Sequence, residues 1–358
     1  MKGPSKAKSI GRVRLPLAVA RQGGYNTEVS FFNDLSVEKR RPGMQGERGT
    51  LWSLWAVAAT WGINVVMVKY LTGMFSPVAL VALRITMAAV LLLVLWRWRW
   101  SGGAGWPKDR KAWIGIFAAG FLSIYLHQLC LATGVRWASA GVASIILAMN
   151  PLITSVSAHW LFGESFGWRQ AMGVLLGFGG VSLAVLRGGE AWIAGPEALR
   201  GEALVFVAML VYVAGGLVIR WIGPRAGAME ITTFSHLFAS VLLLGTATGT
   251  GVWGEDAGWP LDVWPWIVMI LSGWGATALG TMFWNVGIQR IGATRTSIFL
   301  NTTPAAGVIF GGIFLHEHIG IPEVAGLLLV VAGVYLGSRK SAVRPPKGAA
   351  PSTGAISR

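Results

Sequence analysis

The chain has 358 residues and a net charge of +15; 54% of its residues are hydrophobic and only 13% are charged. Soluble domains carry about 25% charged residues, so this composition excludes an ordinary soluble protein. The one cysteine, Cys130, excludes a disulfide framework and a cysteine-based metal cluster.

The N-terminal segment, residues 1–48, is polar and basic, and we expect it to be a disordered cytoplasmic tail. Its apolar run 15–20 is too short for the core of a signal peptide. Met44, just ahead of the first apolar block, is an alternative start of translation. Residues 339–358 form a second basic segment that we also expect to be a disordered cytoplasmic tail.

Between the tails the apolar residues fall into ten blocks, each near the ~20 residues that a helix needs to cross hydrocarbon. The pattern predicts an all-α integral membrane protein with ten transmembrane helices. The expected spans are 51–71, 77–96, 113–133, 138–161, 168–186, 202–221, 230–249, 265–287, 292–315 and 322–338.

The basic residues indicate the orientation of these spans. With ten spans and a cytoplasmic N-terminus, 25 of the 30 Lys and Arg residues fall in the tails, in cytoplasmic loops or at the cytoplasmic ends of spans. This is the positive-inside bias, which predicts an inner or plasma membrane protein with both termini in the cytoplasm. The basic charge is therefore explained by topology, and we expect no nucleic-acid partner.

The chain contains one stretch twice. Residues 113–184 align with residues 266–337 without a gap, at a constant offset of 153. Matched prolines and glycines carry the most weight, because each constrains the backbone or allows a close approach of helices. The matched pairs include Trp113 with Trp266, Gly120 with Gly273, Gly134 with Gly287, Pro151 with Pro304, Glu164 with Glu317 and Gly180 with Gly333.

The duplication predicts two five-helix repeats, residues 49–186 and 202–338, joined by a linker at 187–201. Because five is an odd number, the second repeat enters the membrane from the opposite side, and the two are expected to be inverted repeats. Glycines at a G-x-x-x-G spacing allow helices to pack closely within the bundle or between the protomers of a homodimer. These pairs are Gly173 with Gly177 and Gly333 with Gly337.

Several motifs resemble the drug/metabolite transporter superfamily, in its EamA-type branch. Each half has a span of small residues, a mid-span proline, and a glutamate thirteen residues after it. The opening spans agree, with Trp61-Gly62, Asn64 and Lys69 in the first span and Pro77 with Arg84 in the second. The resemblance covers about 51–338. It implies a ten-span carrier with a central cavity that works by alternating access; many relatives export amino acids or other small metabolites, and some are thought to use the proton gradient.

Ionisable groups inside a membrane are costly, so each is a candidate functional residue. Arg84, in the second span, either faces the cavity and holds a substrate carboxylate or extends along its stem to the interface. His127, with Tyr125 two residues before it, could bind substrate or move a proton. His236 stands roughly where Arg84 stands in the other half. For both histidines the alternative is a hydrogen bond to a neighbouring helix. No pair of histidines has metal-ligand spacing, so no metal or other cofactor is expected.

Polar groups beside the two central prolines form a further candidate surface. Proline frees the carbonyl four residues earlier, and in a membrane that carbonyl needs a neighbour or a cavity. Pro151 and Pro304 lie beside Asn150 and Asn301, so either a polar binding surface or a kink needed only for shape would explain them. Trp284, like Trp61 and Trp274, lies inside a span, where it lines a cavity or packs within the bundle.

The two matched glutamates, Glu164 and Glu317, end the fourth and ninth spans. We expect structural or gating roles for them, because a carboxylate favours a helix N-terminus. The leading hypothesis is a secondary transporter, an exporter of a small polar metabolite, with protons as a possible coupling ion. The alternatives are a lipid or drug translocator of the same fold and an integral-membrane enzyme. The long loops lack enzyme motifs, so no enzymatic activity is expected.

Overall fold

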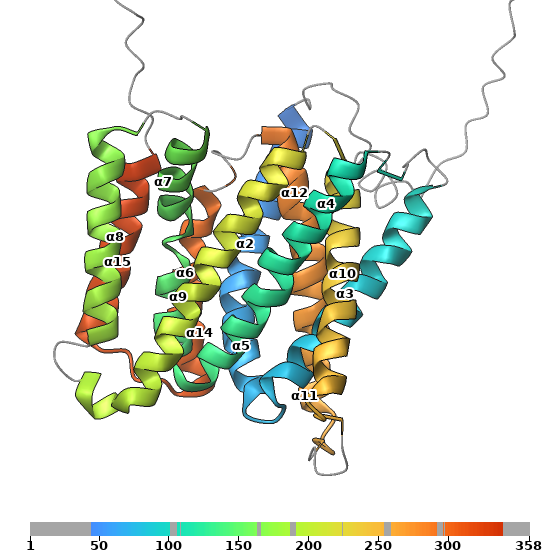
Figure 1. The fold of residues 1–358 in the computed structure, drawn as a ribbon. Helices are drawn as coiled ribbons and strands as arrows, with labels where there is room; N and C mark the ends of the chain where they lie inside the picture. Colours follow the sequence, from blue (N-terminus) through green and yellow to red (C-terminus); the bar gives the residue numbers. More distant parts are fainter. Residues whose placement is uncertain are drawn as a thin grey trace, which may run out of the picture. The chain divides into compact units, whose positions relative to one another are not determined.

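The computed structural model describes residues 44–100, 106–107, 109–162, 166–186, 191–223, 225–253, 259–291, 296 and 298–338. All of its regular elements in these ranges are helical (Figure 1). The helices of the first half are α2 (Met44–Thr72), α3 (Pro77–Trp100), α4 (Arg110–Ala119), η1 (Gly120–Leu126), α5 (His127–Trp137), α6 (Ala140–Leu147), α7 (Asn150–Phe162) and α8 (Trp168–Leu186). Those of the second half are α9 (Ala191–Ile222), α10 (Ala228–Gly249), α11 (Trp264–Ile270), η4 (Leu271–Leu279), α12 (Gly280–Ile291), η5 (Ile298–Asn301), α14 (Thr302–Leu315) and α15 (Ile321–Ser338).

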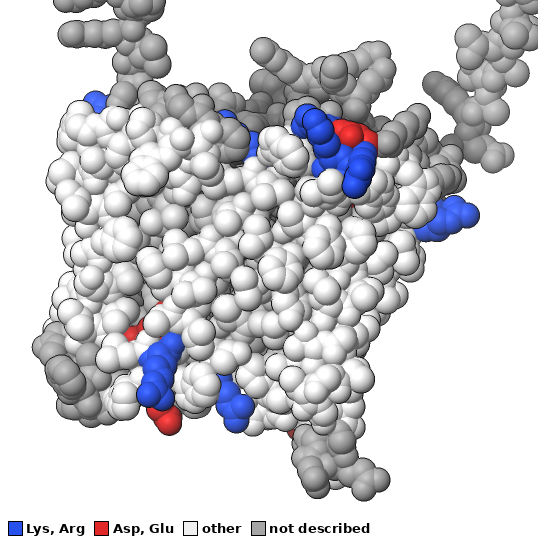
Figure 2. Space-filling view, viewed as in Figure 1, with Lys and Arg blue, Asp and Glu red and all other residues white. Residues whose placement is uncertain are grey.

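Eight helical stretches of the described residues are long and apolar enough to cross a membrane. They coincide with the first eight expected spans. At the ninth and tenth positions lie two shorter apolar helices, Thr302–Leu315 and Ile321–Gly337. On the face seen in Figure 2, the charged side chains gather toward two ends, and an uncharged surface lies between them. Such a band is the surface that hydrocarbon tolerates.

Two expected boundaries are wrong. Helix α2 begins at Met44, so residues 44–48 are helical and do not belong to a tail. Most of the expected linker 187–201 is also helical, because α9 begins at Ala191. The chain bends at Gly195, which has a positive φ of 79°, and Pro196 follows it. Proline suits the first turn of a helix, so the long membrane helix of α9 starts there. Residues 1–43 and 339–358 lie outside the described residues.

The two halves repeat each other in detail. A π-helical segment interrupts the third span at η1 and the eighth at η4, and the two end at Leu126 and Leu279, which are 153 positions apart. The indole nitrogen of Trp113 donates to the carbonyl of Pro107 at 2.9 Å. Its counterpart Trp266 donates to Pro260 at 3.1 Å. The duplication therefore begins earlier than residue 113.

The last helix of each half, α8 and α15, packs on the other through glycine (Figure 1). A Cβ atom on Gly173 would lie 2.5 Å from the carbonyl oxygen of Gly333, and one on Gly180 would lie 2.6 Å from that of Gly326. The two contacts are equivalent, because the offset of 153 relates Gly173 to Gly326 and Gly333 to Gly180. The two helices thus exchange roles between the two contacts, as a two-fold axis requires. These glycines therefore allow close helix packing within the bundle.

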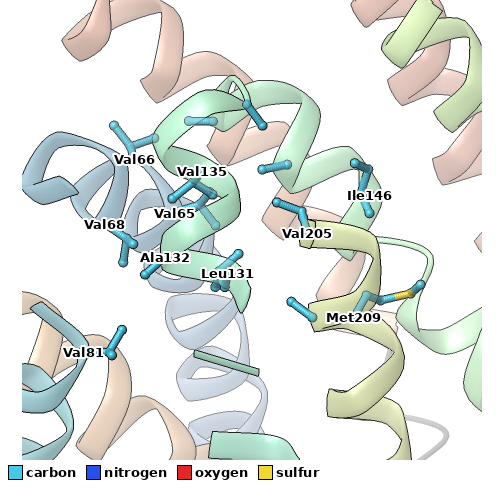
Figure 3. Close-up of a cluster of buried hydrophobic side chains, with 14 of the residues drawn as sticks. Val65, Val66, Val68, Val81, Leu131, Ala132, Val135, Ile146, Val205 and Met209 are labelled. Carbon is cyan, nitrogen blue, oxygen red and sulfur yellow. The ribbon is translucent and has the colours of Figure 1, made fainter. Parts of the chain in front are cut away.

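Most of the buried apolar side chains form one cluster that includes residues of α2, α3, α5, α6 and α9. Figure 3 shows part of it, with α5 between α2 and α9: Leu131, Ala132 and Val135 of α5 lie between Val65 and Val68 on one side and Val205 and Met209 on the other. Side chains in such a core are held in place, so polar groups inside it have fixed partners.

Candidate functional site

The candidate site is centred on Arg84, a fully buried side chain (0% exposed) in an otherwise apolar part of α3. Arg84 is the eighth residue of that helix, about 10 Å along its axis from Pro77. Its side chain turns into the bundle and does not extend along the helix to the surface. Gly273 of η4 lies against its backbone, where a Cβ atom would be 3.0 Å from the Arg84 carbonyl oxygen.

Four elements supply a connected polar network around the guanidinium. Nη1 of Arg84 donates to Oγ of Ser272 at 3.2 Å, and Nη2 donates to Oε1 of Gln128. Ser272 in turn donates to Oδ1 of Asn64 at 2.5 Å. The network thus joins α3, η4, α5 and α2, and it contains residues of both halves. Asn64 and Arg84 were expected in the site, whereas Ser272 was not. Its position next to the matched Gly273 was the available signal.

The charge of Arg84 is met only by neutral groups in the described part of the chain. Its two hydrogen-bond acceptors are a hydroxyl and an amide oxygen, and within the same residues Nε has no hydrogen-bond partner. Placing an arginine at the centre of a membrane helix costs about 2.5–3.5 kcal/mol on insertion scales. A buried cation of this kind gains most from an anionic partner.

His127 lies beside Gln128 in the sequence but faces a different helix. Its Nδ1 is 2.9 Å from the carbonyl oxygen of Ala208 in α9, and its ring centroid lies 5.0 Å from that of Tyr212. Tyr125 turns to α10, where its hydroxyl is 2.9 Å from Oγ1 of Thr246. These two residues are therefore hydrogen-bonded to neighbouring helices and are not part of the Arg84 network.

His236 is buried and bonded within its own helix. Its Nδ1 lies 2.7 Å from the carbonyl oxygen of Thr232, and the Thr232 hydroxyl accepts a bond from Asn285 of α12. A Cβ atom on Gly120 would lie 2.6 Å from the carbonyl oxygen of Ser235. Since Gly120 matches Gly273, the residue equivalent to Arg84 is Ser235, and His236 is one position farther along.

Two of the three tryptophans inside the spans pack on each other. Trp61 and Trp284 have ring centroids 5.0 Å apart, and Nε1 of Trp61 donates to the carbonyl of Ala276 at 2.9 Å. Trp274, by contrast, is 46% exposed on the outside of the bundle. This places Trp284 beside the first span, in contact with both halves.

The chain breaks its helix just before the first central proline. Helix α6 ends at Leu147 and α7 begins at Asn150, ahead of Pro151, and the Asn150 amide oxygen accepts a bond of 3.2 Å from Thr154 of the same helix. In the second half α14 begins at Thr302, and Pro304 is buried. The neighbouring Thr303 hydroxyl donates to the carbonyl of Ala58 at 3.1 Å. The side chain of Asn301 lies outside the described residues.

Glu317 caps a helix of the other half. Its Oε1 accepts from the backbone nitrogen of Ala140 at 2.8 Å and its Oε2 from that of Gly141 at 3.1 Å. Both donors belong to the first turn of α6, where the helix dipole favours a carboxylate. Its counterpart Glu164 lies outside the described residues. No group of three or more His, Cys, Asp or Glu in the described ranges is placed to hold a metal ion.

Comparison with known proteins identifies the class of membrane protein to which this bundle belongs. The model of the EamA-like transporter family matches residues 48–186 and again residues 199–339. The uncharacterized transporters YyaM and YetK of Bacillus subtilis are each 25% identical to this chain, over 80% and 81% of it and 92% and 87% of their own lengths.

A probable amino-acid metabolite efflux pump of Salmonella typhimurium is 22% identical, over 78% of this chain and 91% of its own. One solved crystal structure matches with a TM-score of 0.58 at 15% identity, covering 81% of this chain and 97% of its own, which is a likeness of fold. Two matches of the family model, which together cover most of the chain, identify this protein as a multi-pass membrane transporter of the EamA-like family.

Proposed function

We propose that the protein is a secondary transporter that exports a small metabolite with a carboxylate group, and that Arg84 binds this carboxylate. The observation that carries the proposal is the buried guanidinium whose described partners are all neutral. An arginine presents a planar fork of donors that matches a carboxylate. The name of the Salmonella relative, a probable amino-acid metabolite efflux pump, favours amino acids as the first substrates to test.

The proposal includes ten membrane crossings in two inverted repeats. The two shorter apolar helices, Thr302–Leu315 and Ile321–Gly337, would then be the ninth and tenth spans. The exchanged glycine contacts between α8 and α15 support a two-fold relation of the halves. Ten crossings would put both termini on the same side of the membrane, and the positive-inside bias favours the cytoplasm. Alternating access would be a rocking of the halves about the Arg84 network, which contains groups from each.

Substrate entry then requires a change in the network. In the present conformation Arg84 is closed off, with Gln128 on one side and Ser272 on the other. Opening would separate η4 from α3 and expose the guanidinium to one side of the membrane. The substrate carboxylate would replace one of the neutral acceptors and pair with the guanidinium through two parallel N–H···O bonds, which adds the attraction of opposite charges.

Counterflow in proteoliposomes tests this proposal. Vesicles are loaded with a mixture of unlabelled amino acids, and uptake of each labelled one is followed for wild type, Arg84→Ala and Arg97→Ala. Arg97 lies on the same helix but is exposed, so it is the matched control. We expect exchange by wild type and Arg97→Ala and none by Arg84→Ala. If folded wild type exchanges none of them, amino acids are excluded as substrates, and a lipid or drug translocator is favoured. Exchange that persists in Arg84→Ala would show that Arg84 does not bind the substrate.

A further inference from the structure

A second buried charge lies far from Arg84 in the sequence, at the start of the second half. Glu202 is on α9, six residues after Pro196, about 9 Å into the helix. It is 4% exposed, and both of its carboxylate oxygens are buried. Carboxylates inside membrane spans are rare and mark ion or proton pathways by default.

Glu202 follows a point where α9 meets α5 with backbone against backbone. A Cβ atom on Gly201 would lie 2.6 Å from the carbonyl oxygen of Gly134 and 2.7 Å from the nitrogen of Ala138. In the other direction, a Cβ atom on Gly134 would lie 2.7 Å from the carbonyl oxygen of Gly201. Glu202 follows directly on this contact, so its backbone is level with the last turn of α5.

Lys69 reaches this same turn from α2. Its Nζ donates to the carbonyl of Val135 at 3.1 Å and to that of Ala138 at 2.5 Å. Carbonyls at the end of a helix attract a cation. Directly after them, the nitrogens of Ala140 and Gly141 donate to Glu317. The turn between α5 and α6 thus binds a cation of the first half and the Glu317 carboxylate of the second, and Glu202 lies one residue beyond the contact of Gly201 with the same turn.

The apolar surroundings of this turn strengthen the effect of any change in the charge of a carboxylate there. Val135 packs among Val65 of α2 and Val205 of α9 in the apolar cluster of Figure 3. In such an environment the effective dielectric is low, and the attraction between unit charges is several times stronger than in water. A proton gained or lost by a carboxylate here changes how tightly the two halves are held at this turn.

Few other charged or titratable groups lie near Glu202. Helix α6 contains none. Helix α4 meets α9 at its opposite end, where Gly115 packs on Ile222, and α7 and α8 carry His159 and Arg169. On α9 the remaining groups are the exposed Glu197 and Arg200 and, farther along the helix, Tyr212 and Arg220. On α5 they are the exposed Arg136, with Cys130 and His127 farther from the turn.

We propose that Glu202 is the proton-binding site that couples transport to a proton gradient, with Lys69 as its charge partner. The proton binds a carboxylate oxygen, so one O–H bond forms and the negative charge is lost. Without that charge the attraction toward Lys69 falls, and the α5–α6 turn is released from α9. The coupling role rests on the transport function proposed above; proton binding does not.

Infrared titration of the protein in liposomes tests proton binding without any substrate. We expect a carboxylic-acid carbonyl band that titrates in wild type and in Glu197→Gln, the exposed control on the same helix, and that is missing in Glu202→Gln. In Glu202→Asp the band is expected to shift but to remain, which shows that the loss is not a folding defect. The same titrating band in wild type and in Glu202→Gln would overturn the proposal.

Transport then tests coupling, with the amino-acid mixture as the probe. A pH gradient should drive accumulation by wild type and Glu197→Gln, whereas Glu202→Gln should accumulate no more than empty liposomes while its counterflow stays at the wild-type rate. Driven accumulation that survives in Glu202→Gln overturns the coupling role. If wild type shows no counterflow of any amino acid, the proposed substrate class has failed, and the infrared titration alone decides whether Glu202 binds a proton.

Discussion

The contact between α8 and α15 allows a sharp test, because two adjacent glycines differ in what surrounds them. A Cβ atom on Gly180 would lie 2.6 Å from the carbonyl oxygen of Gly326 and 2.9 Å from a methyl carbon of Val330. A Cβ atom on Gly179 would meet no atom within 4 Å. Alanine at position 180 therefore forces the two helices apart, whereas alanine at 179 does not.

The expected size of the effect follows from this geometry. Restoring ordinary contact moves the helices apart by roughly 1 Å, and a gap of that size loses up to about half of the dispersion energy across the contact. Overpacking of this kind costs about 1–3 kcal/mol. Alanine in place of glycine also favours the helix by about 0.5–1 kcal/mol, and this gain is the only effect expected of Gly179→Ala.

The assay is reversible unfolding in mixed micelles with increasing denaturing detergent, followed by tryptophan fluorescence. We expect the unfolding free energy of Gly180→Ala to fall below wild type and that of Gly179→Ala to equal or exceed it. The gain in helix propensity is common to both variants, so they should differ by the overpacking cost alone, about 1–3 kcal/mol. Gly333→Ala, at the position matched to Gly180, should behave like Gly180→Ala. Equal stabilities for the 179 and 180 variants would refute the packing argument.

Two further predictions concern stability in the same assay. Glu317→Gln should lose about 1.5–3 kcal/mol, the value of a hydrogen bond to a charged group, because the side chain loses its charge and carries an NH2 group in place of one of the two oxygens that accept from Ala140 and Gly141; an unchanged midpoint would contradict the cap. Trp113→Phe and Trp266→Phe should each lose at least the ~0.5–1.5 kcal/mol of the indole hydrogen bond, and by similar amounts because their partners match; a large loss at only one of them would argue against equivalent roles.

The sequence was sufficient for the helical class and for the duplication, but it placed some boundaries wrongly. Trp106-Pro107 and Trp259-Pro260 keep the offset of 153, yet they lie outside the apolar blocks, so the match from residue 113 onward did not include them. Glu202 was overlooked because the apolar pattern put it at the edge of a linker. The helix in fact begins near Pro196, and this makes Glu202 a buried residue.

Which side chains face one another could not be read from helical periodicity. The π-helical segment η1 ends at Leu126, immediately before His127 and Gln128. A π-turn inserts a residue into the helical repeat, so the faces after it no longer follow those before it. For this reason the sequence could not tell that Gln128 bonds Arg84 while His127 turns to α9.

The most direct test of the central claim is whether Arg84 recognises a carboxylate. Thermal unfolding of the purified protein would be followed with each amino acid and with the matching amino-acid amide, for wild type and for Arg84→Gln. A ligand that binds only the folded state raises the midpoint of unfolding. We predict that some amino acids stabilise wild type more than their amides do, and that Arg84→Gln loses this preference. Equal stabilisation of wild type by acid and amide, or a preference that persists in Arg84→Gln, would contradict a carboxylate site at Arg84.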